Sequence, residues 1–452
     1  MLMKRLTLPF LMIAVVFGSA TGALANAPNA DAIEAVKSGQ RADANAAWWG
    51  FNSEDATDAL QSAIDSGAKT VTVPYMGAPW IVRPIKLRSN LELILEPGVL
   101  VLAKAGEFKG KGDSLFTAAD ATDITIRGYG AVLRMRKSDY QSDAYEKAEW
   151  RMGFAFRGCK RILVEGVRVE SSGGDGFYIG ATGENPWCED VTIRDCICDD
   201  HHRQGISVIS AQNLLIENCV LSGTEGTAPE AGIDLEPNNE NERLVNCVIR
   251  NCVIENNAGN GILLYLRPLT SASEPVSIRF EDCVVRMGEP GDALADFTNV
   301  NMKGGAGIRV SALRDDGPQG TIDFVNCTVE NAAEECVALS EKSAKSAVVR
   351  FQDCNFGPSW VAANRGYWKP RVPISISGRR PDVAADLGGI EFVGCHVFDT
   401  VPRPVIAYLP SEGDVALRDI GGTIFAYGSA SARADLGDSA ENVSLEVLAT
   451  KE

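Results

Sequence analysis

Apolar and polar residues alternate in a sequence repeat that recurs between about residue 162 and residue 399. Each copy begins with a run in which every second residue is apolar, such as VTIRDCICDD at 191–200 or VIRNCVIENN at 248–257. A polar turn follows, and a glycine then opens a second short run, such as QGISVIS at 204–210 or AGIDLEP at 231–237. A period of two indicates β-strands. Self-similar units of roughly 20 to 50 residues indicate a solenoid in which each coil covers its neighbour.

The sequence therefore predicts an all-β fold, a single-stranded right-handed parallel β-helix, over residues 71–410. The open first coil of a solenoid needs a cap. Residues 26–70 supply one, because EDATDALQSAIDSG at 54–67 is a clear amphipathic helix with an apolar face. That face is formed by Ala59, Leu60, Ala63 and Ile64. Residues 411–452 are less regular, and we expect them to close the other end.

Cysteine recurs at one position of the first run. Aligning the copies places Gly166 there in the earliest copy and a cysteine in the later ones: Cys196, Cys219, Cys252, Cys283, Cys327, Cys354 and Cys395. Free cysteine is a small apolar core residue, and side chains stacked on parallel strands suit disulfide torsions poorly. We expect an inward ladder of reduced thiols.

The first 25 residues resemble a secretory signal peptide. Lys4 and Arg5 precede an apolar stretch, and Ala23-Leu24-Ala25 forms a small-residue cleavage site. We therefore expect a secreted or periplasmic protein without membrane insertion, since no later run approaches the roughly 18 apolar residues of a span. The net charge of −17 argues against a nucleic-acid partner. The sequence specifies no oligomeric state.

The second runs predict two outward columns on consecutive coils, because strand residues alternate between faces. One column contains Tyr178, Ser207, Asp234, Leu263 and Arg309, and the other contains Gly180, Ile209, Glu236, Tyr265 and Ser311. The preceding loops add Gly-Gly-Asp175-Gly and the segment 199–203. Three neighbouring coils are thus predicted to converge on one polar patch. Its candidate catalytic residues are Asp175, Asp199, Asp200, His201, His202, Asp234 and Glu236.

Glycosidic hydrolysis requires one carboxylic acid and a second carboxylate. Asp234 and Glu236, two residues apart on one strand face, have Cβ atoms about 7 Å apart by strand geometry. A turn-capping role for Asp175 and solvated turn positions for the two histidines remain open alternatives. The side chains expected to bind a polysaccharide or oligosaccharide are Trp150, Arg151, Tyr178, Arg203, Tyr265, Arg267 and Arg309.

The run DATDALQSAID, with TVTVP and WIVRPIKLRSNLELILEPGVLVLA after it, resembles the entry segment of pectin-lyase-like β-helix proteins. The layout is closest to glycoside hydrolases of the polygalacturonase type. That resemblance implies a carbohydrate-active enzyme in which Asp175 and the pair Asp199-Asp200 have catalytic roles.

Two other functions are compatible with the same residues. A polysaccharide lyase or uronate epimerase would use His201 or His202 as base, Tyr178 as acid and Arg203 to neutralise the sugar carboxylate. The segment 199–203 is loosely similar to loops of alginate epimerases and lyases. A glycan-binding or adhesion solenoid without catalysis is the third hypothesis.

The sequence indicates no organic cofactor. The run DLEPNNENE at 234–242 gathers hard oxygen ligands of the kind that calcium prefers, and a solvated acidic turn explains it equally well.

Overall fold

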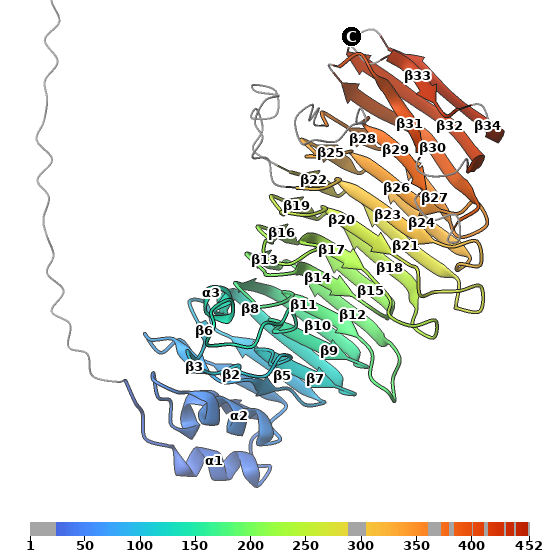
Figure 1. The fold of residues 1–452 in the computed structure, drawn as a ribbon. Helices are drawn as coiled ribbons and strands as arrows, with labels where there is room; N and C mark the ends of the chain where they lie inside the picture. The colour runs from blue at the N-terminus through green and yellow to red at the C-terminus, as the bar shows by residue number, and fades with distance from the viewer. Residues whose placement is uncertain are drawn as a thin grey trace, which may run out of the picture.

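The chain forms an elongated solenoid with helices at its N-terminal end (Figure 1). The computed structural model describes residues 24–287, 304–359, 372–378, 384–399, 401–410, 415–428, 431–437 and 440–450. The predicted signal peptide lies outside the described residues except for its last two positions. None of the helices in the described ranges has the length and apolar character of a membrane span.

Each coil presents three strand faces, and all strand pairs between coils are parallel. The first face begins with β1 (Asp43–Asn45), which pairs with β2 (Thr70–Val73). It continues with the strands β5 (Leu91–Leu95), β12 (Cys188–Arg194), β15 (Ala211–Glu217), β18 (Leu244–Arg250), β21 (Val276–Glu281), β24 (Gly320–Val325) and β27 (Val348–Gln352). The second face contains β3 (Trp80–Val82), β6 (Leu100–Ala103), β13 (Ile197–Asp199), β16 (Val220–Ser222), β19 (Val253–Glu255), β22 (Val284–Arg286), β25 (Thr328–Glu330) and β28 (Asn355–Phe356).

Long strands run through both of these faces and join them into one sheet. They are β8 (Thr122–Arg134), β10 (Lys160–Glu170), β30 (Asp386–Asp399), β32 (Ala416–Gly428) and β34 (Ala440–Ala449). The third face is a separate sheet of β4 (Ile85–Lys86), β7 (Phe116–Ala119), β9 (Phe154–Arg157), β11 (Phe177–Gly180), β14 (Gln204–Val208), β17 (Ala231–Leu235), β20 (Ile262–Tyr265), β23 (Ile308–Leu313), β26 (Val337–Lys342), β29 (Ile374–Gly378), β31 (Pro404–Pro410) and β33 (Ser431–Asp435).

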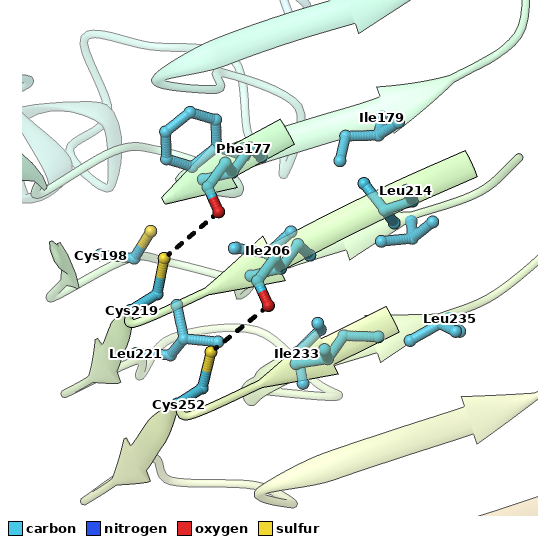
Figure 2. Packing of buried hydrophobic residues seen from close by; sticks show 14 of the residues in the cluster. Phe177, Ile179, Cys198, Ile206, Leu214, Cys219, Leu221, Ile233, Leu235 and Cys252 are labelled. Carbon is cyan, nitrogen blue, oxygen red and sulfur yellow. Dashed lines mark hydrogen bonds between the residues drawn. The ribbon is translucent and has the colours of Figure 1, made fainter. Parts of the chain in front are cut away.

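The cysteine ladder is confirmed. All twelve cysteines are free and buried, and the backbone N–H that follows each ladder cysteine donates to the carbonyl of the ladder cysteine one coil earlier, as Val220 does to Cys196. Figure 2 shows Cys219 and Cys252 stacked among apolar core residues. The thiols therefore serve as small core side chains.

Gly166 is not the first member of this ladder. Glu165 pairs with Arg194 and Arg168 with Ile197, so Val167 lies opposite Cys196. Gly166 lies opposite Asp195 instead, at a bend where both residues have positive φ, 72° and 54°. The left-handed bend recurs in later coils on Asn or Asp, the residue types that tolerate it best after glycine, and on Gly394 before Cys395. The alignment by cysteine was therefore displaced by one residue in the first copy.

The N-terminal end is capped as predicted, and α2 (Thr57–Asp65) buries Ala59, Leu60, Ala63 and Ile64. The helix α1 (Ala30–Lys37) and the 3-10 turn η1 (Ala46–Trp49), which the pattern did not predict, extend this cap. At the other end, the described part of residues 411–452 does not form a separate closing segment. It continues the solenoid as β32, β33 and β34.

Candidate functional site

The candidate site lies where the third face begins. At this corner several successive coils place a glycine against the core: a Cβ on Gly232 would lie 2.3 Å from Cγ2 of Ile254, and one on Gly261 would lie 2.3 Å from Cγ1 of Val285. The residue after each glycine, such as Ile233, is also buried in the core. Because two successive positions face inward, the residue before the glycine is left on the outer side.

Asp175 and Gln204 occupy this position on neighbouring coils, since the backbone N–H of Gly176 donates to the Gln204 carbonyl at 3.0 Å. The Gln204 amide reaches over the outer surface and donates from Nε2 to Oδ2 of Asp234 at 2.5 Å. The corner therefore delivers Asp175 and Gln204 to the same outer surface as Asp234, which lies on β17.

The predicted columns of the third face are confirmed by the strand register. Tyr178 pairs with Ser207, Ser207 with Asp234, and Asp234 with Leu263, which pairs with Arg309. Tyr265 pairs with Ser311 in the second column.

Arg203 is the centre of the site. Its guanidinium donates from Nη2 to Oε2 of Glu236 at 3.1 Å, and it lies 3.7 Å from a carboxylate oxygen of Glu149 and 3.9 Å from one of Asp175. Three coils and the insertion before β9 thus meet at one cation. We call Glu149, Asp175, Arg203, Asp234 and Glu236 the Arg203 cluster.

The two aspartates of the cluster are fully buried, while Arg203, Glu236 and Glu149 form a partly exposed rim with side-chain exposures of 15%, 29% and 32%. Neither carboxyl oxygen of Asp175 has a hydrogen-bond partner among the residues that the structure describes. Burial raises the pKa of Asp175 well above 3.8, and the negative charges of Asp234, Glu149 and Glu236 raise it further, whereas Arg203 lowers it.

Burial also raises the pKa of Asp234, to about 7, with Arg203 opposing the rise and Glu236 adding to it. A carboxyl group that keeps its proton near neutral pH is suited to general acid catalysis. The site therefore places a buried carboxyl group with a raised pKa beside a second, partly exposed carboxyl group.

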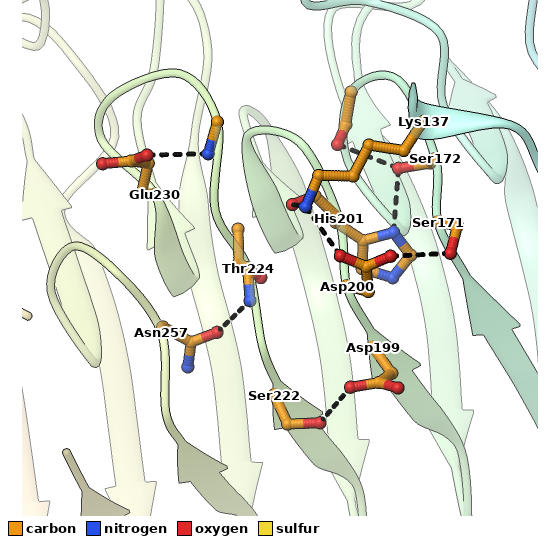
Figure 3. A network of polar contacts seen from close by, with 12 residues as sticks. Lys137, Ser171, Ser172, Asp199, Asp200, His201, Ser222, Thr224, Glu230 and Asn257 are labelled. Carbon is orange, nitrogen blue, oxygen red and sulfur yellow. Dashed lines mark hydrogen bonds and ion pairs between the residues drawn. The ribbon is translucent and has the colours of Figure 1, made fainter. Parts of the chain in front are cut away.

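Asp199 and Asp200 do not join this cluster. Asp199 ends β13 on the second face, where it accepts hydrogen bonds from Arg168 at 2.5 Å and from Ser222 at 2.8 Å. Asp200 occupies the following turn with a φ of 58° and accepts from Lys137 at 2.7 Å (Figure 3). The prediction that they share a patch with Asp234 was wrong, because the turn at Asp200 separates the second face from the third.

The two histidines also lie outside the polar patch in which they were predicted. His201 is fully buried, and its Nδ1 lies 2.8 Å from the Ser172 hydroxyl (Figure 3). Burial, together with the nearby positive charge of Lys137, lowers the pKa of His201 to about 3. His202 is 6% exposed and lies against the loop at Gly226, where a Cβ would come within 1.9 Å of its Nδ1. Burial lowers the pKa of His202 as well. Both rings fill the corner rather than face a substrate.

The two predicted binding residues in the insertion before β9 differ in their exposure to solvent. Trp150 is 46% exposed and directly follows Glu149 of the Arg203 cluster. Arg151, in contrast, is fully buried and donates to the carbonyls of Phe108 at 2.8 Å and Glu146 at 3.0 Å. Arg151 therefore anchors the insertion and is not available to bind a ligand.

The remaining predicted binding residues lie along the third face. Tyr178 is half-buried, with the Arg157 guanidinium 4.4 Å above its ring. Burial raises the pKa of the Tyr178 hydroxyl. Tyr265 and Arg267 are partly exposed at and beyond the end of β20. Arg309 is bound by Glu334 at 3.1 Å and Asn260 at 3.0 Å.

The acidic run at 234–242 is not arranged as a single loop of ligands. Asp234 and Glu236 belong to the Arg203 cluster, while Glu242 is buried and its carboxylate accepts the backbone N–H groups of Asn238 and Asn239. Among the residues that the structure describes, no group of three or more His, Cys, Asp or Glu side chains could hold a metal ion.

Glu149 was missed by the sequence reasoning. It lies in an irregular insertion, and the only signal that could have drawn attention to it was its position beside Trp150.

Comparison with known proteins supports the fold. Residues 146–286 match the family model of the right handed beta helix region. Two proteins of Bacillus subtilis (strain 168) are similar in sequence. The SPbeta prophage-derived uncharacterized protein YorA is 26% identical over 50% of this chain, and the uncharacterized protein YclG is 28% identical over 36% of it. The matches span 40% and 30% of the lengths of these relatives.

Solved structures share the architecture at low sequence identity. A family 28 exopolygalacturonase of Yersinia enterocolitica has a TM-score of 0.54 and 13% identity, with 91% of this chain and 79% of that chain covered. The A-module of the mannuronan C-5 epimerase AlgE4 of Azotobacter vinelandii has a TM-score of 0.54 and 15% identity, with 89% and 100% covered. The chain is thus a right-handed parallel β-helix protein of the pectin-lyase-like fold.

Proposed function

We propose that this protein is a glycoside hydrolase whose catalytic centre is the Arg203 cluster. The observation that carries the proposal is the pair formed by Asp234 and Glu236: burial raises the pKa of Asp234 to about 7, and Glu236 lies two residues on at the partly exposed rim. Glycoside hydrolysis needs such a pair, one carboxyl group that donates a proton to the leaving oxygen and a second that acts as base or nucleophile.

In this mechanism Asp234 is the acid. Its Oδ2 accepts a hydrogen bond from Gln204 at 2.5 Å, which fixes the carboxyl group, while burial keeps the proton in place. Glu236 is the second carboxylate, and it accepts a hydrogen bond from Arg203 at 3.1 Å. Trp150, exposed next to Glu149, is suited to stack on a sugar ring.

Elimination or epimerisation at a uronic acid is the second candidate, since Arg203 supplies a cation and structures with this fold include an epimerase module. The histidine bases that this candidate required are buried in the corner and held neutral. The residues at the cluster therefore favour hydrolysis.

The test is a screen of the purified protein against polysaccharides, with new reducing ends and the ultraviolet absorbance of unsaturated products measured together. We expect reducing ends without unsaturation. Asp234→Asn and Glu236→Gln should each lower the rate by at least about 100-fold, the usual loss for an acid or base catalyst. Asp199→Asn, a matched change on the second face, should retain the rate.

Other outcomes contradict the proposal. Unsaturated products would identify a lyase, and inversion at C5 without cleavage would identify an epimerase. Binding of a glycan with no product would identify a binding or adhesion solenoid.

We also propose that the protein is exported after removal of residues 1–25, from the pattern of charged, apolar and small residues there. N-terminal sequencing of the protein from the periplasm or culture medium should begin at Asn26; recovery only from the cytoplasm with Met1 intact would contradict this.

A further inference from the structure

Acidic side chains outnumber basic ones in the Arg203 cluster. Four carboxyl groups, those of Glu149, Asp175, Asp234 and Glu236, surround one guanidinium. Arg203 is the one cation among the groups that most affect the pKa of Asp175 or of Asp234. The whole chain has a net charge of −17, so its long-range field has the same sign.

The buried carboxyl group of Asp175 is also short of hydrogen-bond donors. Neither oxygen of Asp175 accepts a hydrogen bond from the described part of the chain, although this side chain is fully buried. The carboxyl group of Asp175 faces Arg203, but at 3.9 Å the contact is longer than a hydrogen bond. Buried oxygens without donors are costly, so the site is built for a ligand that brings donors.

Arg203 is loosely held on this side of the cluster. Its single hydrogen bond to a cluster carboxylate is the one to Glu236, whereas its Nε makes only the longer 3.7 Å ion pair with Glu149 and no hydrogen bond to the described residues. A ligand that supplies its own positive charge could therefore take over the contacts to Asp175 and Glu149, while Arg203 stays bound to Glu236.

The rim of the site has the groups that an ammonium prefers. Glu149 offers a carboxylate that is 32% exposed, and Trp150, the next residue in the chain, is 46% exposed. Aromatic faces attract cations, and Arg151 holds both residues in place through its buried contacts with backbone carbonyls.

We propose that the glycan bound at the Arg203 cluster carries a free amino group, so that the substrate class is a hexosamine polymer and not a polyuronate. This inference rests on the proposed function only in assuming that the ligand is a glycan. A sugar carboxylate would add a further negative charge to a site whose one nearby cation is already shared by three carboxyl groups. An ammonium neutralises the site and provides three donors.

The test is calorimetric binding of three oligomers of equal length, made of glucosamine, N-acetylglucosamine and galacturonic acid, at a pH where the amine is protonated. We expect the glucosamine oligomer to bind at least about tenfold more tightly than the N-acetylated one, and the galacturonate oligomer to bind most weakly, because like charges are excluded. Calcium chloride is titrated alone in parallel.

Glu149→Gln should weaken binding of the glucosamine oligomer by about threefold to fivefold, the value of a partly exposed charge pair, and leave the N-acetylated oligomer unaffected. Glu189→Gln is the matched control, because Glu189 is 29% exposed and has one ion pair, to Lys160, on the first face. That variant should bind all three oligomers as the wild-type protein does.

Tighter binding of the galacturonate oligomer, or a Glu149→Gln variant that binds glucosamine unchanged, would overturn the inference. So would calcium binding that Glu149→Gln abolishes. Failure of the proposed function looks different: a glucosamine oligomer that binds and is not cleaved rejects hydrolysis and leaves this inference standing.

Discussion

Replacement of Asp234 by asparagine should stabilise the protein at mildly alkaline pH while it removes activity. In the folded protein burial raises the pKa of Asp234 from 3.8 to about 7. At about 1.4 kcal/mol per pH unit, this shift corresponds to about 4 kcal/mol of unfavourable free energy once the folded carboxyl is ionised. The asparagine side chain of the variant carries no charge and can still accept the hydrogen bond that Gln204 donates.

The effect has a defined pH window. Between about pH 4 and pH 7 the folded protein retains a proton that the unfolded chain has released, so this residue makes the free energy of unfolding fall as pH rises. Asp175, whose pKa is also raised, contributes in the same direction. Because Asp175 is present in both proteins, the difference between wild type and Asp234→Asn isolates Asp234.

The assay is chemical unfolding of both proteins at about pH 4 and about pH 8. At the higher pH the variant should be more stable by an amount that approaches about 4 kcal/mol; at the lower pH the difference should be small. Asp199→Asn, which removes a carboxylate bound by Arg168 and Ser222, should not gain stability at either pH. If Asp234→Asn is less stable than the wild-type protein at the higher pH, the reasoning that the buried Asp234 carboxylate destabilises the folded state is refuted.

Two further predictions concern the core. The cysteines should not react with a thiol reagent in the native protein and should yield twelve thiols per chain after denaturation without reductant, because all twelve are buried and free; fewer thiols would show that disulfides form. Gly232→Ala should lower the free energy of unfolding by about 1–3 kcal/mol, as overpacked cores do, since its Cβ would lie 2.3 Å from Ile254, whereas Gly183→Ala has open space and should change stability little. Equal stability of the two variants would contradict the inward assignment of the corner glycines.

The coils, their apolar interior and the outward columns of the third face could be predicted because each depends on a period of two within one strand. Tyr178, Ser207 and Asp234 lie in register because each follows the corner glycine of its own coil by the same number of residues. The cysteine ladder was predictable for the same reason, and it was displaced at Gly166 only where the copy has no cysteine.

The positions of residues at the corners could not be predicted in this way. A residue in the left-handed conformation changes the direction of the backbone but leaves no trace in the pattern of polar and apolar residues. Asp199, Asp200, His201, His202 and Arg203 are consecutive, yet the turn at Asp200 distributes them over an outer face, a turn, a buried corner and the Arg203 cluster.

The local density of polar residues along the sequence was therefore a poor guide to the site, whereas the register of the strands was a good one. The segment with two histidines and two aspartates contributes a single side chain, Arg203, to the cluster. The two buried carboxyl groups come from positions defined by the corner glycines, Asp175 before one glycine and Asp234 two residues after another. Under the proposed function, a glycan that lies along the third face would cross successive coils and contact these equivalent positions. Substitutions at Gln204 or Ser207 should consequently alter the site more than substitutions at either histidine.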